Sequence, residues 1–247
     1  MEKIITYETL RNFAYCNDHL IHGEVKGIML GFMGLNANSM YSNDGGDARE
    51  WAERGIIYVI PYCNPWSWMN RQTVALTDEI IAVLCQHYHL GRDVKVVSTG
   101  VSMGGLSALV YCAYAEIVPV ACVVNCPVCD LPYHFTERPD LPRTLYSAFS
   151  EYACTLDDAM RSCSPLHLVD RMPDIPYTIF HCGNDLAVNL QQHSARFVEK
   201  MKAEHRIVLH EVPLRGHGDL SPAARIAYEQ AVLEAIFGSD GAVASRQ

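Results

Sequence analysis

Six short apolar runs recur along the chain, and most are followed by a stretch with the spacing of an amphipathic helix. The runs do not alternate apolar and polar residues, which is typical of strands covered on both faces. They occupy 27–32, 56–61, 94–98, 121–125, 177–182 and 207–212. Helices are expected near 45–54, 71–89, 103–115, 189–203 and 221–237. This pattern predicts a three-layer α/β fold, with helices on both faces of a mostly parallel central sheet.

The segment between residues 125 and 177 interrupts the pattern, because it is too long for an ordinary connection. It contains several prolines, and short helices are expected near 143–152 and 155–161. We therefore expect 1–247 to form one domain, in which 127–170 is inserted as a small helical cap. Ligands of such folds bind at the carboxyl ends of the parallel strands, so the cap is expected to cover the site.

Charge and cysteine content disfavour several classes of protein. The 247 residues include 19 Lys and Arg against 28 Asp and Glu, and this net charge of −9 disfavours nucleic acid and anionic membranes as partners. The first residues lack the apolar core of an export signal, so the 10 cysteines are expected to be reduced thiols of a cytoplasmic protein. Cys126 and Cys129 form a lone C-x-x-C without a second pair, so no metal or other cofactor is expected.

The sharpest motif is the hexapeptide 100–105, Gly-Val-Ser-Met-Gly-Gly, which follows an expected strand and opens an expected helix. Such a nucleophile elbow places its serine, here Ser102, on a strained turn with the hydroxyl exposed above the sheet. The helix N-terminus then offers the amide of Met103 to an oxyanion. The alternative is a glycine-rich structural turn with a solvated serine.

A serine nucleophile needs a base, and His217 has the best position among the 11 histidines. It lies in a loop directly after the last expected strand, where the chain order Ser, Asp, His places the base. Asp185 follows the preceding strand and is the expected acid, since a carboxylate there can orient the imidazole. Asp219 is the alternative acid, because it stands only two positions after His217.

With these segments in place, the sequence resembles the α/β-hydrolase superfamily over nearly its whole length, from about Val25 to Phe237. Catalytic domains of prolyl-oligopeptidase-like and acetyl-esterase-like proteins are most similar. The resemblance implies a second oxyanion donor, the backbone amide of Leu35, in the loop after the first central strand. Met33 stands where the family usually has histidine. The short stretch before residue 27 leads us to expect none of the propeller domain that the prolyl-oligopeptidase group carries.

A loop after the second central strand is a candidate wall of the substrate pocket. It carries Asn64, Trp66 and Trp68, which include two of the three tryptophans. The functional interpretation is an apolar and amide-rich surface that binds the acyl or alcohol part of a substrate. The alternative is that both indoles pack beneath the cap or anchor the next helix.

These features predict a serine esterase that cleaves carboxylic esters of short or medium acyl groups. A peptidase or amidase with the same triad is the first alternative. It would be favoured by a cap-lined acidic pocket for a substrate amino group, and the cap offers Glu137, Asp140, Glu151, Asp157 and Asp158. A catalytically inactive binding protein on the same fold is the second. A small-molecule ester is the expected partner, and a homodimer is possible from base rates.

Overall fold

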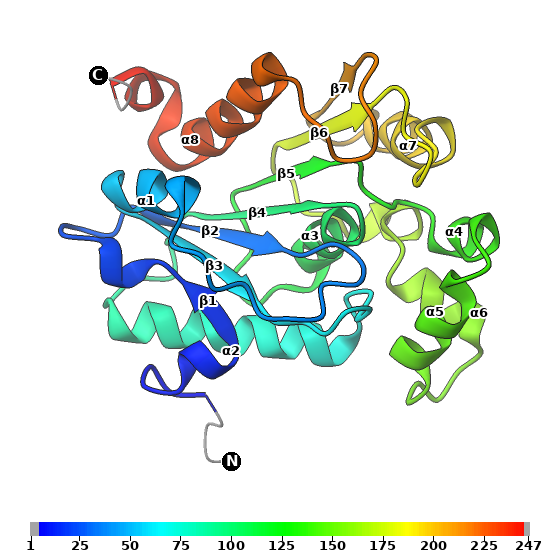
Figure 1. Cartoon of the computed structure of the whole chain (residues 1–247), viewed down its shortest axis with the longest axis horizontal. Coiled ribbons are helices and arrows are strands. Elements are labelled where there is room, and N and C mark those ends of the chain that lie inside the picture. Colours follow the sequence, from blue (N-terminus) through cyan, green and yellow to red (C-terminus); the bar gives the residue numbers. More distant parts are fainter. Residues whose placement is uncertain (1–4, 245–247) are drawn as a thin grey trace.

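The computed structural model describes residues 5–244, which form a seven-stranded sheet with helices on both faces (Figure 1). The strands lie in the order β1-β3-β2-β4-β5-β6-β7. Every neighbouring pair is parallel except β1 and β3. Their bounds are β1 Ala14–Cys16, β2 Gly27–Phe32, β3 Ile56–Pro61, β4 Val96–Val101, β5 Ala121–Asn125, β6 Tyr177–Cys182 and β7 Ile207–Val212. The predicted three-layer fold with a mostly parallel sheet is confirmed.

Two apolar clusters show which helices cover which face of the sheet. The larger cluster contains Leu84 of α2 and Leu106 of α3, and the other contains Trp51 of α1 and Leu233 of α8. The main helices are α1 Gly46–Glu53, α2 Arg71–His87, α3 Met103–Tyr114, α7 Arg196–Met201 and α8 Pro222–Ala244. Short 3-10 helices span Leu10–Asn12, Asp18–Leu20, Pro165–His167 and Val169–Arg171. Burial on both faces explains why the central strands are continuously apolar.

Two predicted elements differ from the structure in ways that matter for the site. The strand expected at 94–98 instead spans Val96–Val101, because a turn in which Val94 N–H donates to Gly91 O precedes it. The helix expected at 189–203 is divided into a π-helical turn, Gln191–Ala195, and the short α7. The π-helical turn directs two neighbouring side chains, His193 and Ser194, into the buried interior.

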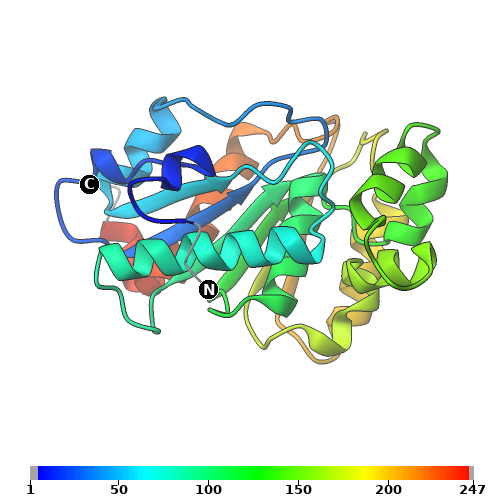
Figure 2. The same cartoon turned by 90° about the horizontal axis from the view of Figure 1, so that it is seen from below.

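Three helices lie together at one end of the molecule, beyond the central strands (Figures 1 and 2). They are α4 Leu131–Glu137, α5 Leu141–Phe149 and α6 Leu156–Ser162, and we call residues 131–162 the cap segment. α4 was not predicted, because a proline such as Pro132 is typical of loops. In the structure Pro132 lies in the first turn of α4, where proline is tolerated. Asp130 caps this helix by accepting a hydrogen bond from Tyr133 N–H.

No helix within residues 5–244 has the length and apolar character needed to cross a membrane.

Candidate active site

Ser102 occupies the turn between β4 and α3 with φ 61° and ψ −123°. Its N–H donates to Asn125 O at 3.0 Å, and its carbonyl accepts from Leu106 N–H at 3.0 Å. A positive φ at a residue other than glycine costs free energy and is characteristic of functional turns. The backbone of Ser102 is therefore held in the strained geometry that a nucleophile elbow requires.

Two glycines permit this turn because other backbone atoms pass close to them. A Cβ on Gly100 would lie 2.2 Å from Gly104 O, and a Cβ on Gly104 would lie 2.1 Å from Phe32 O. The end of β2 thus packs directly on the first turn of α3. This contact brings the loop that follows β2 beside the predicted nucleophile.

The predicted acid and base meet at the carboxyl ends of β6 and β7. His217 Nδ1 lies 2.7 Å from Asp185 Oδ2, while Asp185 Oδ1 accepts from Ala187 N–H at 2.8 Å and Val188 N–H at 2.9 Å. The Asp185 side chain is fully buried and that of His217 is 29% exposed. With both carboxylate oxygens engaged, the bond to Asp185 fixes the orientation of the imidazole.

Asp219, the alternative acid, lies elsewhere in the same loop. Its carboxylate pairs with Arg215 at 3.0 Å, and its side chain is 57% exposed. Burial raises the pKa of Asp185, but hydrogen bonds from His181, His217 and two backbone amides outweigh burial and hold the pKa well below its ordinary value. Asp185 is therefore the carboxylate that remains ionised beside His217.

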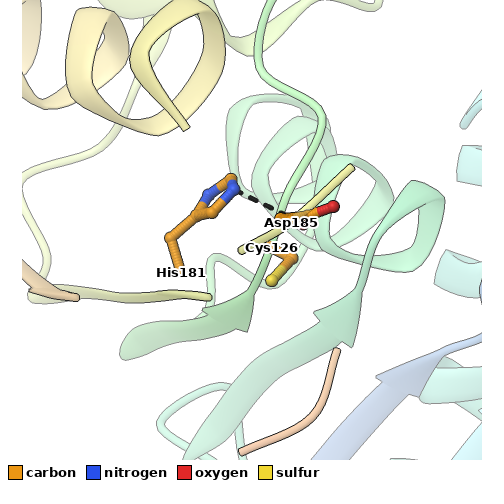
Figure 3. Close-up of side chains that lie close together, drawn as sticks. All are labelled: Cys126, His181 and Asp185. Atoms are coloured by element: carbon orange, nitrogen blue, oxygen red, sulfur yellow. Dashed lines mark ion pairs between the residues drawn. The ribbon is translucent and has the colours of Figure 1, made fainter. Parts of the chain in front are cut away.

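His181 is a further neighbour of this carboxylate, and the sequence analysis did not identify it. Its Nε2 lies 3.5 Å from Asp185 Oδ2 (Figure 3). The same nitrogen lies 3.1 Å from Val188 O, while Nδ1 lies 2.7 Å from Ser194 Oγ. A carbonyl oxygen only accepts, so Nε2 carries the proton and donates it to Val188 O, with the Asp185 carboxylate close to the same nitrogen. The only signal in the sequence was a histidine four residues before the acid, within an apolar strand.

Cys126 lies beside His181 and Asp185, and these three side chains resemble a metal-binding set (Figure 3). The hydrogen bonds do not fit a metal. The proton that His181 donates to Val188 O occupies Nε2, the nitrogen that faces Asp185. Burial also raises the pKa of the Cys126 thiol well above its ordinary value, whereas a thiolate is the ligand form.

A second set of this kind lies away from the Asp185–His217 pair and joins α4 to the π-helical turn. His134 Nδ1 and His193 Nε2 both contact Glu137 Oε2. His193 Nδ1 accepts from Cys129 N–H and Asp130 N–H, each at 3.1 Å. Nε2 therefore carries the proton and donates to Glu137. A histidine that bound a metal through Nε2 would instead carry its proton on Nδ1 and donate that N–H to an acceptor, but here Nδ1 is itself an acceptor. Hydrogen bonding to an ionised carboxylate accounts for this cluster.

Asn125 connects the nucleophile elbow to the loop that carries His217. Its carbonyl accepts from Ser102 N–H, and its Nδ2 donates to Gly218 O at 3.0 Å. A Cβ on Gly218 would lie 3.2 Å from a methyl group of Val101, the residue before Ser102. The structure describes no hydrogen bond between the Ser102 hydroxyl and His217. Catalytic hydrogen bonds are often long without substrate and shorten in its complex.

The two predicted oxyanion donors come from the elbow itself and from the loop after β2. Met103 opens α3, and a Cβ on Gly34, the residue before Leu35, would lie 3.9 Å from Ser102 Cβ. Asn36 N–H donates to Pro65 O at 2.8 Å, which holds the loop after β2 in place. Met33 packs against an apolar cluster rather than hydrogen bonding as a histidine would.

The predicted pocket wall divides into two parts. Asn64 and Trp66 line a cavity of about 350 Å³ between this loop and α5. Trp68 does not: its side chain is fully buried, and its Nε1 donates to Thr144 Oγ1 of the cap segment at 3.1 Å. The substrate-binding prediction for Trp68 is therefore wrong, because its indole is enclosed beneath the cap and its N–H is satisfied there.

The sequence matches no protein-family model and no curated protein. Solved structures are similar to it. A Pyrococcus horikoshii acylaminoacyl peptidase has a TM-score of 0.64 at 14% identity, covering 85% of this chain and 36% of that chain. A Mycobacterium tuberculosis puromycin-hydrolysing peptidase has a TM-score of 0.66 at 17% identity, covering 87% and 34%. A Thermogutta terrifontis esterase has a TM-score of 0.62 at 20% identity, covering 89% and 85%.

The extent of these matches differs between the two kinds of neighbour. The chain spans about a third of the length of the two peptidases, 36% and 34%, and 85% of the length of the esterase. Sequence identities of 20% or less establish a shared fold and leave the substrate open. Together with the strand order and the elbow between β4 and α3, they show that this chain has the α/β-hydrolase fold.

Proposed function

We propose that the protein is a serine hydrolase that cleaves carboxylic esters of short or medium acyl groups. One observation carries the proposal: the buried Asp185 holds His217 at 2.7 Å, at the same edge of the sheet as the strained Ser102. A structural serine turn needs neither an oriented imidazole nor a buried ionised carboxylate. The binding-protein alternative leaves this arrangement unexplained.

The chemistry follows from the positions of these groups. His217 Nε2 accepts the Ser102 proton as Oγ attacks the ester carbonyl, while His217 Nδ1–H donates to Asp185. The amides of Met103 and Leu35 stabilise the oxyanion of the tetrahedral intermediate. His217 then protonates the leaving alcohol, and water attacks the acyl-enzyme by the same route.

A peptidase is the second candidate, because two of the similar structures are peptidases. The cap segment supports the ester instead. All five of its candidate carboxylates already have partners: Glu137 with two histidines, Asp140 with Arg138, Glu151 with Gln72, Asp157 with Arg161, and Asp158 with Thr155. Three of the five, Glu137, Asp140 and Asp157, are paired with histidine or arginine, which makes them poorer sites for the amino group of a peptide than an unpaired carboxylate. A cytoplasmic location and a homodimer stay predictions.

Fluorophosphonate labelling with intact-mass analysis tests the proposal. The wild-type protein should gain one adduct, Ser102→Ala none, and Ser39→Ala, which changes an exposed loop serine, one. Panels of alkyl esters and aminoacyl amides would then be compared by kcat/KM. A folded wild-type protein without an adduct would favour the binding-protein alternative, and faster amide than ester cleavage would favour the peptidase.

A further inference from the structure

The cavity lined by Trp66 shares two of its lining residues, Asn64 and Ser67, with a small void beside the elbow. We call it the Trp66 cavity; it lies between residues 64–72 and residues 147–152. Its volume of about 350 Å³ falls within the ~300–1,000 Å³ range of small-molecule sites. Asn64 and Ser67 also line a small void that reaches Met103 at the elbow. The hydrogen bond from Asn36 N–H to Pro65 O joins this loop to the oxyanion loop.

The two charged residues of this cavity are both engaged in contacts between the cap segment and the start of α2. The Arg71 guanidinium donates to Glu151 O at 2.9 Å and lies over the Tyr152 ring, 4.9 Å from its centroid. The Glu151 carboxylate accepts from Gln72 Nε2 at 3.0 Å. These contacts fasten the cap segment to the start of α2. The charged side chains of Arg71 and Glu151 therefore hold the walls of the cavity together, and both already have partners without a charged ligand.

The remaining lining is neutral and rich in hydroxyl groups. Ser67 is 5% exposed, and its hydroxyl has no hydrogen-bond partner among the described residues. Ser147 and Ser150 also line the cavity, and Trp66 adds a large, partly exposed indole. A buried hydroxyl without a partner costs free energy, which a ligand that supplies the missing hydrogen bond would recover.

From this lining we propose that the Trp66 cavity binds a neutral polyhydroxylated group, and that the natural substrate is an O-acylated sugar. The C–H face of a sugar ring packs on the indole, while its hydroxyls exchange hydrogen bonds with Ser67 and Asn64. Water hydrolyses the ester to release the free sugar hydroxyl and the carboxylic acid. This substrate class rests on the proposed function, whereas binding of the sugar alone does not.

Hydrolysis of three acetate esters by the full chain tests the substrate class. The probes are an O-acetylated methyl glucoside, cyclohexyl acetate, which has a ring without hydroxyls, and the zwitterion O-acetylserine. The glucoside should be cleaved with a kcat/KM at least about tenfold higher than either of the others. Equal values for the glucoside and cyclohexyl acetate, or a preference for O-acetylserine, would overturn the proposal.

Ser67→Ala separates a binding role from a structural one. Because the hydroxyl lacks a partner, its removal should leave Tm unchanged or raise it, yet lower the preference for the glucoside about tenfold. Trp66→Ala should lower the preference at least as much. Tyr146→Ala, which changes a residue of α5 that is 67% exposed, is the control and should preserve it. An unchanged preference in Ser67→Ala and Trp66→Ala would contradict the assignment.

A binding experiment that needs no catalysis tests the sugar site separately from the proposed esterase activity. Saturation-transfer NMR of methyl glucoside with Ser102→Ala should show contact, and the added Trp66→Ala change should abolish it. If Ser102 is labelled by the fluorophosphonate but methyl glucoside does not bind, the esterase proposal stands and the sugar-site proposal is overturned. If methyl glucoside binds but no serine is labelled, the sugar-site proposal stands and the esterase proposal is overturned.

Discussion

Glu137→Gln tests the hydrogen-bonded cluster that joins α4 to the π-helical turn. Burial raises the pKa of Glu137, but hydrogen bonds from His134 and His193 outweigh it and bring the pKa to about 2, against an ordinary value of 4.5. At 1.36 kcal/mol per pKa unit, this difference corresponds to about 3 kcal/mol of stabilisation. Glutamine keeps the size and one accepting oxygen, so the substitution removes mainly the charge.

The sign of the pH dependence follows from the lowered pKa. The stabilisation is complete above pH 4.5 and is lost as the pH falls from 4.5 toward 2, because the unfolded state then binds a proton at Glu137 that the folded state does not. Urea unfolding should show Glu137→Gln about 3 kcal/mol less stable than wild type at pH 7. By pH 3 the difference should shrink to roughly 1 kcal/mol.

Glu199→Gln is the matched control, since Glu199 forms a surface pair with Lys202 and its side chain is 71% exposed. Its loss should be under about 1 kcal/mol at either pH. The reasoning would be refuted if Glu137→Gln cost no more than this control at pH 7. It would also fail if the difference between Glu137→Gln and wild type stayed constant from pH 7 to pH 3.

Three further predictions concern the elbow, the triad and the cap. Gly104→Ala should lower the free energy of unfolding by about 3 kcal/mol or prevent folding, because the new Cβ would lie 2.1 Å from a carbonyl oxygen of β2; an unchanged Tm contradicts this. Asp185→Asn should lower kcat for a nitrophenyl ester roughly 10³–10⁴-fold by disturbing the His217 tautomer; a loss below tenfold argues against the triad. Trp68→Phe should cost about 1–3 kcal/mol in chemical unfolding, since a buried hydrogen bond is lost; no loss argues against the cap anchor.

Local chemistry explains why the positions of Ser102, Asp185 and His217 at one edge of the sheet could be predicted. Asp185 and His217 each follow an apolar strand, and parallel strands bring their carboxyl ends to one edge of the sheet. Ser102 carried its own signal in the flanking glycines. The six central strands were predicted for the same reason, because burial on both faces leaves an unbroken apolar run. The strand β1 has three residues and was missed, since so short a run has no readable period.

The residues that were missed act through tertiary contacts. His181 and Asn125 lie within central strands. A single polar residue in an apolar run gives no indication in the sequence of which residue it contacts. Their partners are 4 and 93 positions away, Asp185 and Gly218 respectively. Trp68 was misassigned because sequence position brings it to the site edge but does not show which way the side chain points. The cap decides that orientation, since its enclosing residues lie more than 70 positions further along the chain.

The π-helical turn Gln191–Ala195 has a consequence for how the cap and the acid influence each other. Its adjacent residues His193 and Ser194 reach in different directions: one binds Glu137 of the cap segment, the other binds His181 beside Asp185. A tilt of α4 must therefore either break the Glu137 contact or rotate this turn. Because adjacent residues of this one turn contact Glu137 and His181, the position of the cap segment and the alignment of the Asp185 carboxylate are coupled through it.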